Sequence, residues 1–137
     1  MFSYFSASLA IIFNALYHKA LSSDEDGYVD VYEGSAYKRD LSYHQGITWP
    51  WLLGLYYDAL KNTMIIEKNR TKKQELEEKI TKLVYTTKET FKAEMFERSS
   101  IGTISEIYDS TEPYEERGAF AQAWSVAEIF RIVLNKR

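Results

Sequence analysis

Apolar residues recur at helical spacing in the second half of the chain. Leu76, Ile80, Leu83, Val84, Phe91 and Met95 follow one another at intervals typical of one helix face, which predicts an amphipathic helix. Just before them, Thr71-Lys72-Lys73-Gln74 has the form of a capping box. Glutamate and lysine pairs four residues apart lie on the other face. We therefore interpret this segment as an outer helix with one solvent-exposed side.

Two further segments are apolar on most sides. The first begins at Trp49 or Pro50 and ends near Asn69, and the second runs from Ala119 to about Asn135. Pro50 suits the first turn of a helix, so it marks the start of the first segment. A helix that is apolar around most of its circumference is usually buried. We predict that both are inner helices.

The N-terminal part of the chain divides into an apolar and a polar stretch. Residues 1–21 have an apolar centre, but polar residues interrupt it, and neither a basic start nor a cleavage site accompanies it. We predict an N-terminal apolar helix there rather than a membrane span. Residues 22–48 are predicted to form a long loop, with an acidic turn at residues 23–27 and an extended stretch at residues 28–32. The acidic turn lacks the ligand spacing of a calcium site.

These segments together predict one all-α domain over residues 1–137, with about four helices. Three of them, and the loop that carries Glu106, lie in residues 49–137. The length, the 45% hydrophobic content and the few glycines and prolines fit a single helical domain.

Composition narrows the function classes. The net charge of -3 gives no basic surface for nucleic acid, so we expect no nucleic-acid partner. The absence of cysteine excludes disulfides and thiolate metal sites and fits a reducing compartment, for which the cytoplasm is the default. No metal, cofactor or membrane partner is expected.

Two polar and aromatic runs stand out between the predicted helices. Tyr43-His44-Gln45-Gly46-Ile47-Thr48-Trp49-Pro50-Trp51 combines aromatic rings, an imidazole and an amide just before an apolar helix. Gly102-Thr103-Ile104-Ser105-Glu106-Ile107-Tyr108-Asp109 places two carboxyl groups in an aromatic setting. Rings with polar tips suit amphipathic ligands. The two runs predict a carbohydrate site.

The stretch from Tyr37 to Gly54, which includes the first run, closely resembles the amylo-alpha-1,6-glucosidase region of glycogen debranching enzymes. The second run, followed by Arg117-Gly118 and by Ala121-Gln122-Ala123-Trp124-Ser125-Val126-Ala127-Glu128, is similar to the end of the same domain. The resemblance covers about Leu21 to the C-terminus. It implies a toroid of six helical hairpins that holds the sugar in its centre, of which this chain resembles a C-terminal portion.

The resemblance also implies a reaction, the inverting hydrolysis of an α-1,6-glucosidic bond in a glycogen-type glucan. Such hydrolysis needs an acid and a base whose carboxyl groups are roughly 6.5–9.5 Å apart. Glu106 matches the general base, whereas the tryptophan-rich motif of the general acid is absent from this sequence. We expect this chain to be inactive alone. Glu106 also suits the cap of a helix or turn, and Asp109 suits a bond to its own backbone.

Sugar-binding roles follow from the same resemblance. Arg39 and Asp40 match positions that line the sugar pocket, although a structural ion pair is an equal alternative. His44 and Gln45 can donate and accept hydrogen bonds to sugar hydroxyls. For His44, a purely structural role is the alternative.

The aromatic and helix-start residues complete the predicted site. Tyr43 and Trp49, at the edge of the loop, suit a pocket wall, and Gln122 at the start of the last helix joins them. Trp51 and Trp124 lie inside predicted helices, where packing is favoured. Glu128 is expected to be exposed or ion-paired.

A function of another class remains open. A non-catalytic helical interaction module would self-associate, or would complement a separate N-terminal polypeptide that completes the toroid, through apolar helix faces. It would need the helices but not Glu106. A relic without activity is a third alternative.

Overall fold

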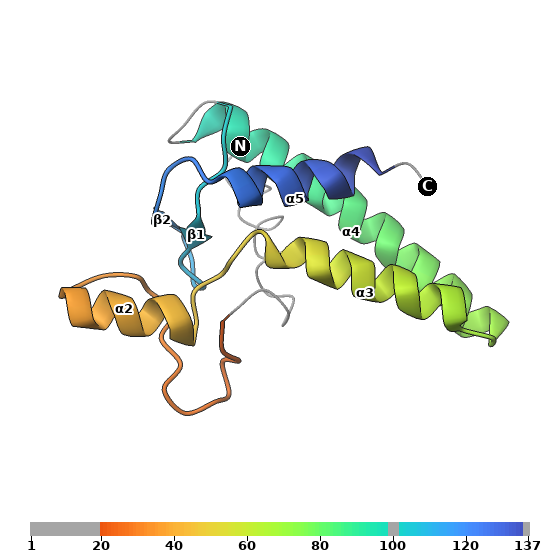
Figure 1. Ribbon diagram of the computed structural model, residues 1–137, viewed down its shortest axis with the longest axis horizontal. Helices are drawn as coiled ribbons and strands as arrows, with labels where there is room; N and C mark the ends of the chain where they lie inside the picture. The colour runs from red at the N-terminus through yellow and green to blue at the C-terminus, as the bar shows by residue number, and fades with distance from the viewer. Residues whose placement is uncertain (1–19, 99–101, 136–137) are drawn as a thin grey trace.

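The computed structural model describes residues 20–98 and 102–135 (Figure 1). In these residues the helices are α2 (Ala36–Gln45), α3 (Leu52–Ile66), α4 (Arg70–Glu97) and α5 (Ala123–Leu134). Two short strands, β1 (Ile107–Tyr108) and β2 (Glu116–Arg117), pair antiparallel. The predicted all-α class is confirmed. The helix predicted over residues 1–21 lies outside the described residues, apart from its last two positions.

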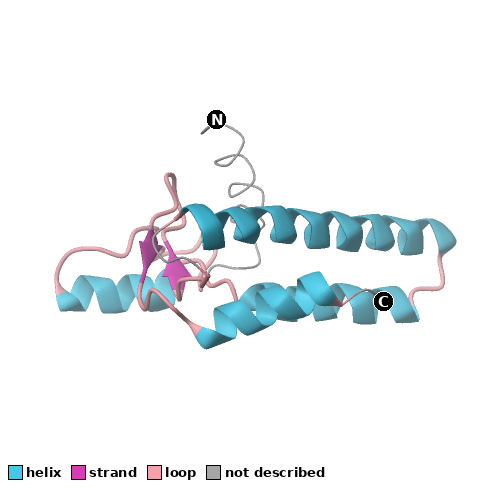
Figure 2. Cartoon of the chain, turned by 90° about the horizontal axis from the view of Figure 1, so that it is seen from above, coloured by secondary structure: helices cyan, strands magenta, loops and turns pink. Residues whose placement is uncertain are grey.

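Three helices form the body of the molecule. Each of α3, α4 and α5 contacts the other two. Helices α3 and α4 run antiparallel, and α5 runs in the same direction as α3 (Figure 1). As Figure 2 shows, the strands and α2 gather at one end of this body. The N-termini of α3 and α5 therefore both lie at the end that carries the strands.

The main core lies where the three helices meet. Its buried residues come from all three helices and from the segment after α4: Leu53, Tyr57, Phe91, Ile104, Tyr108, Tyr114, Ile129 and Ile132. The predicted apolar face of α4 packs onto this core through Ile80, Leu83, Val84 and Met95. The amphipathic pattern therefore identified the correct face of the longest described helix.

The apolar surfaces of α3 and α5 are only partly covered by the described residues. Leu55 and Ile66 on α3 are 56% and 76% exposed, and Leu134 on α5 is 65% exposed. The expectation that both helices are inner ones thus holds for one side of each. In the part of the chain that the structure describes, no helix is both long enough and apolar enough to cross a membrane.

The predicted long loop over residues 22–48 contains a helix and is corrected in that respect. Helix α2 begins after Ser35, whose side chain accepts a hydrogen bond from the Lys38 N–H, and ends at Gly46. Ser42 is its one buried residue, so α2 carries no apolar stripe that periodicity would detect. The serine cap and the terminal glycine were the available signals.

The ends of the other helices differ slightly from the prediction. Helix α4 begins at Arg70, because the Asn69 side chain accepts a hydrogen bond from the Lys72 N–H at 3.1 Å. The capping box expected at Thr71 is therefore displaced by an asparagine cap. Helix α3 ends at Ile66, three residues before Asn69.

The strands connect the body to α2. Thr48 and Tyr108 exchange backbone hydrogen bonds of 3.0 Å, so the chain before α3 lies along β1. Successive strand residues point to opposite sides, and accordingly Tyr108 joins the main core whereas Ile107 packs with Ile47 and Trp49. The two-stranded hairpin therefore separates two clusters of side chains.

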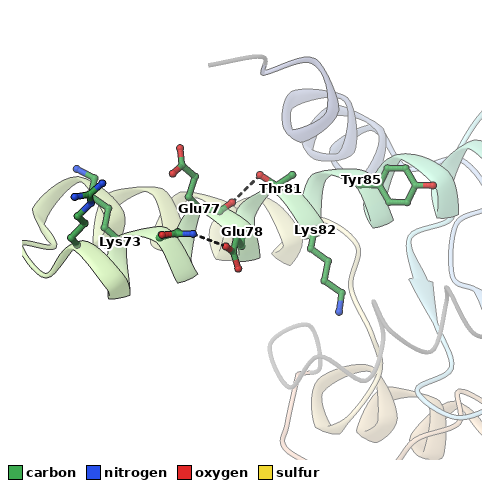
Figure 3. A pocket seen from close by; sticks show the side chains of 8 residues that line it. Lys73, Glu77, Glu78, Thr81, Lys82 and Tyr85 are labelled. Carbon is green, nitrogen blue, oxygen red and sulfur yellow. Dashed lines mark hydrogen bonds between the residues drawn. The ribbon is translucent and has the colours of Figure 1, made fainter.

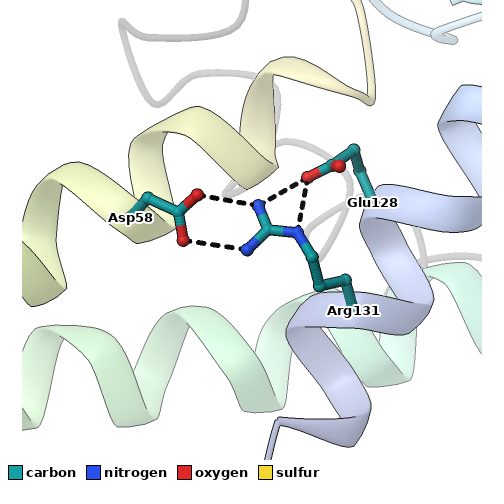
Figure 4. A network of polar contacts seen from close by, with 3 residues as sticks. All are labelled: Asp58, Glu128 and Arg131. Carbon is teal, nitrogen blue, oxygen red and sulfur yellow. Dashed lines mark hydrogen bonds and ion pairs between the residues drawn. The ribbon is translucent and has the colours of Figure 1, made fainter.

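An ion-pair network joins α3 to α5 (Figure 4). Both terminal nitrogens of Arg131 reach Asp58, at 2.8 and 3.0 Å, and its Nη2 also reaches Glu128 Oε2 at 2.6 Å. A Cβ on Gly54 would lie 1.7 Å from Glu128 Oε2, so the glycine makes room for this carboxylate. Glu128 is ion-paired, one of the two roles expected for it.

Candidate functional site

A pocket of about 530 Å³ opens at the end of the body that carries the strands. Its lining comes from Ala20, the end of α2, the chain before α3, and the first turns of α3 and α5: Ala20, Tyr43, His44, Trp49, Trp51, Leu52 and Trp124. The volume falls in the range of roughly 300–1,000 Å³ that is usual for small-molecule sites. Five of the seven lining residues carry an aromatic ring, so the wall is broad and apolar with polar tips.

The rings of the wall form a connected series. Tyr43 lies edge to face against His44, with centroids 5.1 Å apart, and against Trp49 at 4.5 Å. Trp49 in turn contacts Trp124 at 6.1 Å, and Trp124 contacts Trp51 at 5.9 Å. These are favourable aromatic geometries. The wall therefore extends without interruption from α2 to α5.

Buried hydroxyl groups fix the chain that carries Trp49. The hydroxyls of Thr48 and Ser110 are hydrogen-bonded at 2.7 Å, and the Ser110 hydroxyl also donates to the Gly46 carbonyl at 2.5 Å. Both Thr48 and Ser110 are buried. Because buried polar groups that pair with one another define a single geometry, these bonds hold Trp49 at a fixed place beside α3.

Glu106 lies one hydrogen bond away from the pocket lining. The Tyr43 hydroxyl donates to its Oε1 at 2.5 Å, and the Ala119 N–H donates to its Oε2 at 2.9 Å. Burial, and then the hydrogen bond to Glu106, raise the pKa of Tyr43 to about 12. Tyr43 therefore stays protonated near neutral pH and remains a donor to the carboxylate.

Gly118 makes this placement of Glu106 sterically possible. Its φ is +69°, a left-handed conformation that glycine adopts readily, and a Cβ there would lie 2.5 Å from Glu106 Oε2. The carboxylate thus rests against the backbone turn that precedes α5. Glu106 therefore accepts a backbone hydrogen bond, as a capping residue does, and also lies beside the pocket.

The second carboxylate of the run, Asp109, is held in a different way. It accepts a hydrogen bond from the Tyr32 N–H at 2.8 Å and two from the Arg117 guanidinium, from Nε at 3.0 Å and from Nη2 at 2.8 Å. This pairing raises the pKa of Arg117. Asp109 is 3% exposed, so it ties the extended stretch before α2 to the strands.

The predicted sugar contacts divide into two groups. Tyr43, His44 and Trp49 line the pocket as expected, whereas four others are not among its described lining residues: Arg39, Asp40, Gln45 and Gln122. Arg39 and Asp40 lie on the exposed surface of α2, where Arg39 donates to the Gly34 carbonyl at 2.6 Å. Gln122 caps α5, and its side chain accepts a hydrogen bond from the Ala123 N–H at 3.0 Å.

Two tryptophans expected to be mainly packing residues belong to the pocket wall. Trp51 and Trp124 both line it, and Trp124 is 46% exposed. Each occupies the first turn of α3 or α5 or the residue just before it. Position at a helix start, next to the polar runs, was the sequence signal that could have assigned them to the wall.

A second acidic cluster lies on the core side of the hairpin. Glu94 is 4% exposed and accepts a hydrogen bond from the Tyr108 hydroxyl at 2.6 Å. Arg98 Nε lies 3.6 Å from Glu94 and 2.9 Å from Glu116. Burial, together with the neighbouring Glu116 carboxyl, raises the pKa of Glu94 to about 8 against the opposing effects of Tyr108 and Arg98.

A larger hollow on α4 has a different character (Figure 3). Its volume is about 860 Å³, and its lining residues all belong to α4: Arg70, Lys73, Gln74, Glu77, Glu78, Thr81, Lys82 and Tyr85. A surface supplied by one helix, with charges of both signs, does not enclose a ligand. The aromatic pocket, built from four segments, is the better candidate site.

Comparison with known families agrees with the resemblance seen in the sequence. The family model described as amylo-alpha-1,6-glucosidase matches residues 9–131, which is most of the chain. No curated protein and no solved structure matches significantly. The matched span includes both polar runs, the aromatic pocket and Glu106. The chain belongs to the amylo-alpha-1,6-glucosidase family.

Proposed function

We propose that the aromatic pocket is part of the α-glucan site of a glucosidase domain like that of glycogen debranching enzyme. The observation that carries the proposal is the Tyr43–Glu106 hydrogen bond of 2.5 Å. It joins a pocket-lining ring to the residue that matches the general base, although the two lie 63 positions apart in sequence. Membership of the family supports a glucan as the ligand.

The pocket has the chemistry that a sugar ring requires. A glucosyl unit has hydroxyl groups around its edge and apolar C–H groups on its faces. Tyr43 and Trp49 offer ring surfaces to such faces, and the ring nitrogens of exposed His44 offer hydrogen bonds to the hydroxyl groups. We place these three residues in direct contact with the glucan. Arg39, Asp40, Gln45 and Gln122 lie outside this contact set.

Glu106 has the capacity to act as general base. An ionised carboxylate has about four acceptor positions, and Tyr43 and Ala119 occupy two of them. We assign one of the other positions to the water molecule that attacks the sugar. Tyr43 and the turn at Gly118 hold the carboxylate, so its orientation is set before substrate binds.

Hydrolysis needs a second carboxyl group to protonate the leaving oxygen. We propose that this carboxyl group comes from a separate or upstream polypeptide segment that completes the toroid. Residues 1–137 alone then do not hydrolyse the glucan. General acid and general base assistance each contribute about 10²- to 10⁴-fold. Loss of one of them therefore leaves little activity on a stable glycosidic bond.

A hydrolysis assay tests the catalytic part of the proposal. The 137-residue chain is incubated with a branched limit dextrin, and released glucose is measured beside a Glu106→Gln control. The expected rate is the same for both proteins. Release well above the control would contradict inactivity of the chain alone, and release that needs an added upstream polypeptide and Glu106 would support its role as base.

An assembly module is the second candidate, and the exposed apolar side chains favour it. Ile65 and Ile66 at the end of α3 and Leu134 at the end of α5 are each more than half exposed. Such surface commonly marks a protein interface. Light scattering separates the two candidates: a tight dimer whose mass and stability are indifferent to maltooligosaccharides supports assembly, whereas a monomer that binds them supports the glucan site.

A further inference from the structure

Trp124 is an exposed aromatic residue in a pocket whose other tryptophans are covered to a greater degree. It is 46% exposed, whereas Trp49 is 9% exposed. An exposed indole beside a concave wall leaves a large apolar surface in water. We propose that Trp124 and Trp51 form a second glucosyl subsite, next to the one at Tyr43 and Trp49. This inference rests on the proposed glucan function.

The rings of Trp51 and Trp124 face each other at an incline. The planes of Trp51 and Trp124 are inclined by 33°, with centroids 5.9 Å apart, so their faces are closer to parallel than to perpendicular. Trp49, by contrast, meets Trp124 at 67°. The wall therefore turns between Trp49 and Trp124. Two neighbouring sugar rings, one beside Trp49 and one beside Trp124, would therefore contact different aromatic surfaces.

Trp124 lies on a side of α5 that is not part of the main core. The buried residues of α5 are Ser125, Ile129 and Ile132, which face the main core. Trp124 instead shares a row with Glu128 and Arg131, four and seven residues further on. Along this row α5 meets α3 rather than the centre of the core.

The ion-pair network holds α3 and α5 together beside Trp51 and Trp124. Arg131 on α5 binds Asp58 on α3 through two hydrogen bonds, and Gly54 lets Glu128 lie against α3 (Figure 4). Trp51 and Trp124 lie one turn before Gly54 and Glu128, respectively. The network thus positions the tryptophans before a ligand arrives, and a preorganised site loses less entropy on binding.

The ligand class follows from this arrangement. A pocket of about 530 Å³ with two aromatic surfaces suits at least two linked glucosyl units, each with one apolar face against a ring. A single glucose would occupy only one surface. Trp124 is therefore a specificity-determining residue that selects oligosaccharides over monosaccharides.

Calorimetric titration of the full chain with glucose and with maltotriose tests the subsite. Trp124→Ala is expected to weaken maltotriose binding about tenfold, the effect of losing one aromatic contact with its apolar area, and to change glucose binding less than about twofold. Trp124→Phe keeps a ring and is expected to retain most of the affinity. Phe130→Ala is the matched control, because Phe130 is 43% exposed on the same helix but lines another groove.

The outcomes separate this inference from the proposed function. A wild-type chain that binds neither sugar overturns the proposed function and with it the subsite. A chain that binds maltotriose equally well with and without Trp124 overturns the subsite alone. An equal loss for glucose and maltotriose shows a single subsite and also overturns the inference. Trp124→Leu, which keeps apolar bulk without a ring, gives the same test if the alanine variant folds poorly.

Discussion

The two sides of the β1–β2 hairpin hold carboxylates in opposite ways. On the pocket side, Glu106 is half-buried and accepts hydrogen bonds from two neutral donors, Tyr43 and the Ala119 N–H. On the core side, Glu94 is buried beside Glu116 and Arg98, and its pKa is raised to about 8. Shifted pKa values accumulate at functional sites but also in structural networks. The raised pKa of Glu94 belongs to a network of this structural kind in the core.

The contrast extends to the packing of the two sides. The core side is closed by side chains of three helices, whereas the pocket side is walled by rings from several segments and stays open at His44 and Trp124. We therefore expect stability to depend mainly on the core side and ligand binding mainly on the pocket side. Four variants test this division.

The largest effect is expected from Phe91→Ala. Phe91 is 1% exposed in the main core, and truncation of a buried phenylalanine costs about 3–5 kcal/mol. Denaturant unfolding measures the loss. His44→Ala on the pocket side is the control and should change the free energy of unfolding by less than about 0.5 kcal/mol. Similar losses in both variants would contradict the division.

Glu94→Gln is expected to change how stability depends on pH. The pKa of Glu94 is about 8 in the folded chain, whereas the ordinary pKa of a glutamate side chain is 4.5. Between these values the folded state binds more protons than the unfolded state, so stability falls as pH rises. The loss is on the order of a few kcal/mol. Glutamine preserves the shape and the contact with Tyr108 but removes the titration.

Melting temperatures between pH 5 and pH 9 measure this effect. The wild-type value should fall across the range, and the Glu94→Gln value should fall less. An unchanged slope in Glu94→Gln would show that another group controls the dependence.

A smaller effect is expected from Gly118→Ala. The positive φ alone costs an alanine about 1–2 kcal/mol, and the new Cβ would also displace Glu106 Oε2, which lies 2.5 Å away. Gly102→Ala is a matched control, because its φ is +83° but nothing lies within 4 Å of its Cβ. We expect both to lose stability and only Gly118→Ala to weaken glucan binding as well. If both variants bind the glucan equally well, the position of Glu106 does not affect glucan binding.

The smallest effect is expected from Asp58→Asn. The Arg131 and Asp58 side chains are 37% and 46% exposed, and ion pairs this accessible contribute about 0.2–1 kcal/mol. The loss should shrink further in 1 M salt, because screening then acts over roughly 3 Å. Thermal unfolding at low and high salt checks this. A loss of stability above 2 kcal/mol, unchanged by salt, would contradict the description of this network as a solvent-exposed ion pair.

Much of the fold could be predicted from periodicity. The apolar face of α4 was predicted because burial selects residues at helical spacing, and Ile80 and Phe91 do pack on the core. Helix α2 was not predicted, because only Ser42 is buried in it and its stability depends on its caps and neighbours. The polar sequence of α2 therefore did not indicate a helix, because contacts with the rest of the chain determine its structure.

The candidate site was predictable in its parts but not in its contacts. The aromatic run identified Tyr43, His44 and Trp49 as wall residues, since rings with polar tips suit a wet pocket. The bond between Tyr43 and Glu106 joins residues 63 positions apart, and no local pattern encodes such a contact. The exposure of Trp124 depends in the same way on how α5 turns against α3.

Titration of the chain with maltotriose tests the central claim most directly, namely that the aromatic pocket binds an α-glucan. The account predicts one binding site, about five- to tenfold weaker in His44→Ala, as expected for the loss of hydrogen bonds of about 1 kcal/mol each. Lys82→Ala, on the α4 surface, should leave binding unchanged. Absence of binding, or binding that responds to Lys82 and not to His44, would contradict the account.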